Sequence, residues 1–164
     1  MKLYGKGVLP KDAKRIGSAT TKYYVRKTGQ FIYSKLDFLN GAFGIIPDER
    51  DGFESTLDLP AFDVLDSVLK EWFLYYIIRP EYYTKQLGLA KGQRKARRVN
   101  PTEFLNSKIL IPPLEEQEEI TEFLTICQHE INLLKQLAEK YKTQKRGLMQ
   151  KMLTGIWRVC GFAE

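Results

Sequence analysis

Cysteine and histidine are scarce in this sequence, and long apolar runs are missing. A membrane-spanning helix needs about 20 consecutive apolar residues, which no stretch approaches. The N-terminus also lacks the apolar core of a signal peptide. Cys127 falls in a predicted helix and Cys160 in the tail, so we expect neither a disulfide framework nor a metal site. These absences favour a cytoplasmic protein that needs no cofactor.

The motifs of common catalytic sites are also missing. The sequence contains no GxGxxG, no P-loop and no Cys/His cluster with metal-ligand spacing. The single histidine, His129, lies in a predicted helix beside Glu130, where we expect it to face solvent. Neither Asn40 nor Asn100 begins the Asn-Pro-Pro-aromatic signature of adenine methyltransferases, because no proline follows the first and only one follows the second. We therefore expect a non-catalytic protein.

The net charge of +6 is distributed unevenly along the chain. Residues 1–35 hold nine lysines and arginines against one acid, whereas residues 48–71 hold eight acids against two cations. Five more cations fall within residues 91–98. Such basic blocks favour a polyanionic partner, although a charge run by itself is also typical of a solvated face.

Short strands and helices alternate in the first two thirds of the chain. Periodicity, capping residues and turn residues predict strands at residues 22–27, 30–35, 40–47, 57–64 and 109–111. A helix is predicted at residues 68–78, with Asp66 or Ser67 as its cap, and a further helical turn or two at 81–87. Asn100 caps a third short helix that opens with Pro101. The predicted fold class is α+β, a small mixed domain followed by one long helix.

The strand at residues 22–27 carries basic and aromatic side chains on one face. Because side chains alternate along a strand, Lys22, Tyr24 and Arg26 share a face, while Tyr23 and Val25 share the other. Cations and aromatic rings on one face can hold phosphates and stack on bases, and Lys35 in the next strand is a further candidate phosphate contact. The alternative, which the apolar character of Tyr-Tyr-Val favours, is that this strand belongs to the sheet core.

The segment GLAKGQRKARRV at residues 88–99 is the strongest candidate for contact with DNA. Its two glycines predict a flexible loop, and arginine and glutamine are the side chains that read guanine and adenine edges in the major groove. Lysine and arginine also hold phosphates. The alternative is a solvated loop. The candidate DNA-binding residues of this segment are Lys91, Gln93, Arg94, Lys95, Arg97 and Arg98.

The last third of the chain predicts one long helix. Pro112 and Pro113 favour a helix start, and four glutamates in the first turn and a half suit the positive end of the helix dipole. Apolar residues then recur at heptad-like spacing, which predicts a partner helix, although such a stripe could also pack on its own domain. The candidate helix–helix interface consists of Ile120, Phe123, Leu124, Cys127, Ile131, Leu134, Leu137, Tyr141 and Leu148. The predicted parts are a basic mixed domain at 1–111, a long helix at 112–155 that pairs with a partner helix, and a tail at 156–164.

Several of these stretches together resemble the specificity subunit of type I restriction-modification systems. The resemblance covers roughly residues 20–157, and it is carried by YYVRKTGQFIYSKLDFLNGAFGIIP, NPTEFL, IPPLEEQEEI and KRGLMQKMLTG. It implies a target-recognition domain that reads one half of a split site on double-stranded DNA, and a long helix that pairs antiparallel with a second one as a spacer. The implied partners are modification subunits, which methylate adenine from S-adenosylmethionine, and a restriction subunit.

The sequence departs from that family pattern in two ways. It holds one recognition domain and one long helix where a full subunit has two of each, and its globular part begins partway through such a domain. The second half would come from homodimerisation or from another fragment. The leading hypothesis is thus a DNA-specificity module. The alternatives are an assembly module that acts through its helix without binding DNA, and a nuclease or methyltransferase that would need turnover of its own.

Overall fold

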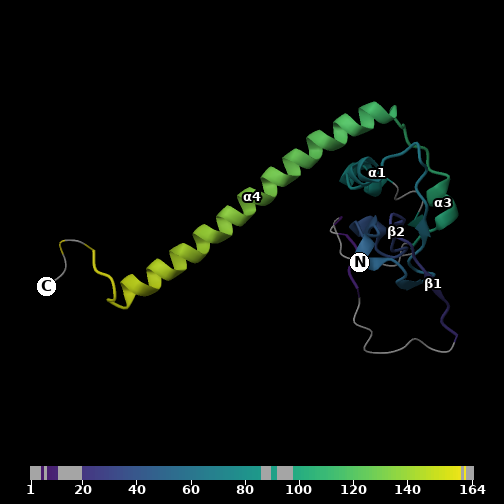
Figure 1. The fold of residues 1–164 in the computed structure, drawn as a ribbon. Helices are drawn as coiled ribbons and strands as arrows, with labels where there is room; N and C mark the ends of the chain where they lie inside the picture. Colours follow the sequence, from purple (N-terminus) through teal and green to yellow (C-terminus); the bar gives the residue numbers. More distant parts are fainter. Residues whose placement is uncertain are drawn as a thin grey trace. The chain divides into compact units, whose positions relative to one another are not determined.

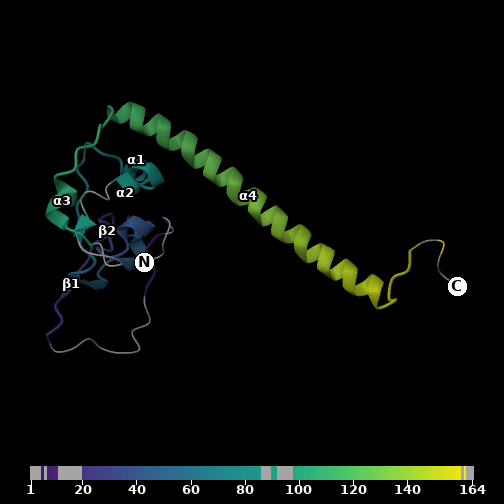
Figure 2. The same cartoon turned by 180° about the vertical axis from the view of Figure 1, so that it is seen from behind.

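The computed structural model describes residues 5, 7–10, 20–85, 90–91, 98–159 and 161. The chain forms two compact units, Met1–Thr121 and Glu122–Glu164. Short strands and helices make up the first unit, and a single long helix begins in it and supplies most of the second (Figure 1, and from behind in Figure 2). The predicted fold class, a mixed domain followed by one long helix, is confirmed.

The elements follow one another in the order β1 (Tyr23–Val25), β2 (Phe31–Tyr33), η1 (Phe38–Asn40), β3 (Phe43–Ile45), η2 (Asp48–Arg50), β4 (Glu54–Thr56), β5 (Ala61–Phe62), α1 (Lys70–Ile77), α2 (Pro80–Lys85), β6 (Ala90–Lys91), β7 (Arg98–Val99), α3 (Pro101–Leu105) and α4 (Leu114–Leu153). In the described residues, β1 pairs with β4 and β6 with β7, while β2 lies between β3 and β5; all these pairs are antiparallel.

Strand β2 lies at the centre of the first unit, and its three residues are all buried. The rings of Phe31, Tyr33, Phe38 and Phe104 pack around it, with centroids 5.4 Å apart for Phe38 and Phe104 and 5.7 Å apart for Phe31 and Phe104. Aromatic pairs at such distances contribute about 1 kcal/mol each beyond the area they bury. Phe73 of α1 meets the ring of Phe31 edge-on at 5.1 Å, which connects the helices to the sheet.

The three short helices confirm the predicted sites of helix formation but not every cap. In α3, the side chain of Asn100 accepts a hydrogen bond from the backbone N–H of Thr102, as predicted. In α1, neither Asp66 nor Ser67 is the cap: the N-cap is Leu69, and its backbone N–H donates to the side chain of Gln117. The backbone N–H of the residue before α1 is therefore bonded to a side chain 48 positions away, and no side chain in the described part of the chain caps the first turn itself.

Two of the predicted strands differ in the structure. Of the predicted strand at 57–64, only Ala61–Phe62 forms a strand, β5; residues 57–60 form the turn that follows β4, a strand that the sequence did not predict. Residues 109–111 form no strand, although the structure describes them. Ile109 instead packs its side chain against the aromatic core. Apolar residues in these two segments therefore do not mark strands: Ile109 packs inward from an irregular segment, while Leu57 and Leu110 are exposed.

Helix α4 is 40 residues long and confirms the predicted long helix. Both prolines precede its first residue, and the backbone N–H of Gln117 reaches the carbonyl oxygen of Pro113. Gly155, with φ of +77°, follows the last turn, as expected for a glycine that ends a helix. In the part of the chain that the structure describes, no helix is long and apolar enough to cross a membrane.

Candidate nucleic-acid interface

The cationic segment at residues 88–99 is bounded by a pair of short strands. Strands β6 and β7 pair so that Lys91 lies opposite Arg98 and Ala90 opposite Val99. The ends of the predicted loop are therefore brought together as a hairpin. Four of the candidate residues, Gln93, Arg94, Lys95 and Arg97, lie outside the described residues, as does the side chain of Lys91.

Strand β7 is fixed to the aromatic core through Val99. This residue is fully buried, and its backbone N–H donates to the carbonyl oxygen of Lys35 over 2.9 Å. Its carbonyl oxygen accepts a hydrogen bond from the hydroxyl of Tyr33 over 3.2 Å. Burial raises the pKa of the Tyr33 hydroxyl well above its usual range, so the hydroxyl remains protonated and able to donate. Strand β7, which closes the cationic segment, is thus anchored in the aromatic core through Val99.

Removal of this hydroxyl should weaken the base of the hairpin. We expect Tyr33→Phe to lower the free energy of unfolding by about 1–2 kcal/mol, because the substitution leaves a buried carbonyl without this donor. Urea denaturation at neutral pH measures the change.

The pH dependence of stability provides a control for that variant. Since the folded-state pKa of Tyr33 is raised, its contribution to stability is complete below the unfolded tyrosine value of about 10 and is lost as the pH rises through the folded-state pKa. Tyr33→Phe should show a smaller loss of stability than wild type above pH 10. Equal losses in the two proteins would contradict the assignment.

A short segment, Asp58–Leu59, connects three of the candidate cations. The backbone N–H of Lys35 donates to the carbonyl oxygen of Asp58 over 2.9 Å. The guanidinium of Arg98 lies 3.5 Å from the Asp58 carboxylate, and that of Arg26 donates to the carbonyl oxygen of Leu59 over 2.9 Å. Arg26 directly after β1, Lys35 two residues after β2 and Arg98 of β7 therefore all contact one turn between β4 and β5.

The ion pair between Arg98 and Asp58 is exposed to water. More than half of each side chain is accessible, so the pair stabilises the domain by less than about 1 kcal/mol. Arg98 can therefore exchange this carboxylate for a phosphate or a base edge at little cost. Lys35, by contrast, is half-buried.

Strand β1 lies at the surface, and the interpretation of its Tyr-Tyr-Val as sheet core is wrong. Tyr24 is 37% exposed and Val25 63% exposed, and Lys22 before them is also exposed. The reason is that β1 pairs with β4 alone among the described strands, so this two-stranded ribbon leaves its side chains open to solvent.

Arg26 is held by the protein more firmly than its neighbours. Its Nε donates to the hydroxyl of Ser55 over 2.7 Å, and its guanidinium lies 5.4 Å from the ring centre of Tyr24. Burial lowers its pKa, with the charge of Tyr24 acting in the opposite direction. Two of its five donors are thus used inside the chain, so Arg26 positions Tyr24 and β4 and retains part of its hydrogen-bonding capacity for a ligand.

Sequence reasoning missed Asp58, Ser55 and Gln117. Asp58 was one of eight acids in an acidic stretch, and nothing local distinguishes it from the others. Ser55 accepts from Arg26 across 29 residues of chain, a pairing that only the β1–β4 register creates. For Gln117, the available signal was its place among four glutamates at the start of the long helix, where a lone amide suggests a buried role.

The apolar stripe of α4 is open to solvent in the single chain. Ile120, Leu124 and Cys127 are half-buried, and the sulfur of Cys127 forms no disulfide. The remaining predicted interface residues are exposed, in fractions from 38% to 67%: Phe123, Ile131, Leu134, Leu137, Tyr141 and Leu148. His129 is exposed, as predicted. A stripe of this length left uncovered is typical of a helix that has a partner.

The comparisons with a family model and with known proteins agree on one family. The model of the type I restriction modification DNA specificity domain matches residues 61–143, just over half of the chain. The specificity subunit of the type I restriction enzyme MjaVIII of Methanocaldococcus jannaschii is 31% identical over 87 residues. The putative MjaX specificity subunit of the same organism is 29% identical over 90 residues. The matched regions cover 53% and 52% of this chain but only 20% of either relative.

Solved structures share the fold at lower identity. The crystal structure of the HsdS subunit from Thermoanaerobacter tengcongensis superposes with a TM-score of 0.62 at 20% identity, covering 85% of this chain and 36% of that one. A chain from a structure of type I R-M complex assembly and conformational transition gives a TM-score of 0.58 at 23% identity, covering 81% and 31%. These similarities establish the fold.

Proposed function

The chain belongs to the type I restriction modification DNA specificity domain family, and on this basis we propose that it recognises one part of a split DNA site. The observation that carries the proposal is the β6–β7 hairpin, which presents a strongly cationic segment from a buried anchor at Val99. In this proposal Arg94, Arg97, Arg98 and Gln93 contact base edges in the major groove. The phosphate contacts are Lys22, Arg26, Lys35, Lys91 and Lys95, with Tyr24 beside them.

Residues 1–111 form the recognition part in this proposal, and residues 112–155 the spacer. Methylation and cleavage would be performed by modification and restriction subunits, so that this chain performs no catalysis of its own. The site of action would be the cytoplasm. The similarity to curated specificity subunits supports this division of labour.

The charge of α4 favours antiparallel pairing with a second copy or a related helix. Its first twenty residues hold six glutamates and no lysine or arginine, whereas its last twenty hold six lysines and arginines and one glutamate. Parallel pairing would place like charges side by side, and antiparallel pairing places the acidic half of one helix against the basic half of the other. The helix dipoles then also oppose each other favourably. At 1.5 Å per residue, the spacer is about 60 Å long.

Binding to a mixed-sequence duplex at several salt concentrations tests the proposal. Neutralisation of about five phosphates per domain predicts a slope near −4 to −5 in a plot of log affinity against log salt concentration. The triple variant Arg94→Ala, Arg97→Ala, Arg98→Ala removes three proposed base-edge contacts but no proposed phosphate contact, so it should lose on the order of a hundredfold in affinity with little change in slope.

A second triple variant controls for net charge. Lys135→Ala, Lys140→Ala, Lys142→Ala removes the same charge from the exposed surface of α4 and should bind as wild type does. Equal losses in both variants would show that affinity follows total charge and would remove the hairpin assignment.

The second candidate is an assembly module that acts through α4 alone, and the solvent-exposed stripe on that helix is the observation that favours it. It predicts a stable dimer or heteromer that has no salt-sensitive affinity for DNA. Sedimentation combined with the same titration separates the two candidates.

A further inference from the structure

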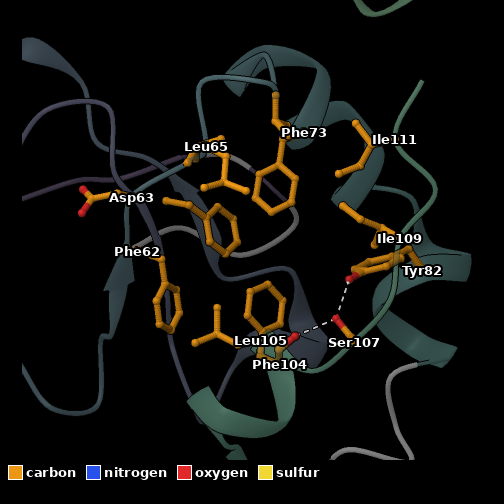
Figure 3. A pocket seen from close by; sticks show the side chains of 13 residues that line it. Phe62, Asp63, Leu65, Phe73, Tyr82, Phe104, Leu105, Ser107, Ile109 and Ile111 are labelled. Atoms are coloured by element: carbon orange, nitrogen blue, oxygen red, sulfur yellow. Dashed lines mark hydrogen bonds between the residues drawn. The ribbon is translucent and has the colours of Figure 1, made fainter. Parts of the chain in front are cut away.

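An apolar pocket of about 230 Å³ lies within the first unit, beside the aromatic core. Figure 3 shows the rings of Phe62, Phe73 and Phe104 around it, with Tyr82 and Ser107 on one side. The hydroxyl of Ser107 donates to the carbonyl oxygen of Phe104 over 2.7 Å and lies 3.4 Å from the hydroxyl of Tyr82. A dry apolar cavity of about 150 Å³ accommodates a benzene ring, so this pocket is large enough for an aromatic side chain.

The mouth of the pocket is apolar and exposed. Leu65 is 72% exposed and Ile111 46% exposed, and both line the pocket; Leu110 beside them is 88% exposed. Ile111 lies only three residues before the first residue of α4. The pocket opening is therefore adjacent in sequence to the acidic end of the long helix, where antiparallel pairing brings the basic end of a second copy.

A second apolar patch lies at that basic end. We call it the C-terminal patch; it consists of Met149, Met152, Leu153, Ile156, Trp157 and Val159, which are between 45% and 82% exposed. The tail after α4 is held in place: the backbone N–H of Trp157 donates to the carbonyl oxygen of Lys151, whose Nζ lies 4.2 Å from the centre of the indole ring. The indole is thus presented to solvent from a defined position.

The register of the stripe brings these two features to the same level. If Leu134 faces Leu134 of a second copy, Ile120 faces Leu148, and the tail around Trp157 comes opposite Ile111. Moving the register by one turn, about four residues, in either direction places Trp157 opposite a position between residues 107 and 115. Antiparallel pairing in this register therefore brings the exposed indole toward the start of the partner's α4, the helix that begins three residues after the pocket residue Ile111.

We propose that Ile156 and Trp157 of a second copy dock into the pocket lined by Leu65, Phe104 and Ile111. The inference rests on the antiparallel pairing proposed above and adds a specific site to it. Burial of these side chains removes apolar surface from water on both copies. A buried indole N–H also needs an acceptor, and the hydroxyl oxygens of Tyr82 and Ser107 are available in the pocket. An antiparallel dimer would contain two such contacts, one at each end of the helix pair.

Acrylamide quenching of tryptophan fluorescence in the full chain tests this site. Trp72 is 5% exposed and Trp157 is 49% exposed, so quenching reports mainly on Trp157. We expect quenching to fall about fivefold as the dimer forms, in proportion to the indole surface that the pocket removes from water. Trp157→Ala should raise the dimer Kd by about thirtyfold for each docked tail.

Substitution at the pocket mouth distinguishes docking from pairing. Leu65→Asp should restore quenching of Trp157 while sedimentation still shows a dimer, whereas Leu57→Asp, at a residue that is 56% exposed and away from the pocket, should change neither. A dimer in which Trp157 is as accessible as in the monomer would overturn the docking and leave the pairing intact. Protection that is insensitive to Leu65→Asp would also overturn the docking, and if it arises in a parallel dimer it would overturn the antiparallel pairing as well. Absence of any dimer would overturn both.

Discussion

The double substitution Leu134→Glu, Tyr141→Glu is expected to leave the chain monomeric at concentrations where the wild type is a dimer. In the single chain these side chains are 58% and 61% exposed, so the change costs the monomer little. In a helix pair the same positions lie in the apolar seam, and each dimer would have to bury four carboxylates without partners. Several kcal/mol of penalty raise the dimer Kd by more than about a thousandfold. Sedimentation velocity measures the change directly.

A matched variant uses the opposite face of the same helix. Gln136→Glu, Thr143→Glu adds the same charge with the same spacing of seven residues, at exposed positions two residues beyond each seam position. It should remain a dimer, and circular dichroism should show unchanged helix content in both variants. If Leu134→Glu, Tyr141→Glu leaves the oligomeric state as it is, the stripe does not form the interface.

The parts of the fold that could be predicted from sequence are those that local rules determine. The heptad spacing and the glycine after Thr154 define α4 to within a few residues, and Asn100 followed by proline defines α3. The two-stranded ribbon of β1 and β4 could not be predicted in the same way, because its residues pair across about 30 positions of chain. The apolar residues of β1 are exposed because, among the described strands, β1 pairs only with β4. No local sequence pattern encodes this pairing.

For the candidate site too, local features could be predicted from the sequence and long-range contacts could not. Composition was sufficient to identify the cationic segment at 88–99, because five cations in eight residues cannot all be neutralised by local neighbours. The way in which the site is built depends on contacts between distant residues: Tyr33 with Val99, and Arg98 with Asp58. These contacts follow from the burial of β2 and from the turn between β4 and β5, whose residues the sequence predicted to be part of a strand at 57–64.

Gln117 belongs to one of the motifs that carry the family resemblance, and the structure shows what its side chain binds. It is the glutamine of LEEQ, and it is fully buried among glutamates that are exposed. Its Oε1 accepts from the backbone N–H of Leu69 over 2.8 Å, and its Nε2 donates to the carbonyl oxygens of Pro112 over 2.8 Å and Ser67 over 3.1 Å. One amide therefore joins the first turns of α4 to the start of α1.

Gln117→Met is accordingly expected to lower the free energy of unfolding by about 4 kcal/mol, since the variant keeps the side-chain volume but removes a partner from three backbone groups in a region sheltered from water. Denaturation by urea in the Leu134→Glu, Tyr141→Glu background measures this loss without a contribution from dimerisation. Such a loss is a large fraction of the stability of a domain of this size.

An exposed glutamine on the same helix provides the matched control. Gln128 donates through Nε2 to the side chain of Asn132 over 3.1 Å at the surface, so Gln128→Met should change stability by less than about 0.5 kcal/mol. Gln117→Glu retains the acceptor for Leu69 but loses both donations, and it would also bury a charge, so it should be at least as unstable as Gln117→Met. Wild-type stability in Gln117→Met would mean that packing of the first turn of α4, and not this amide, holds the helix start to the domain.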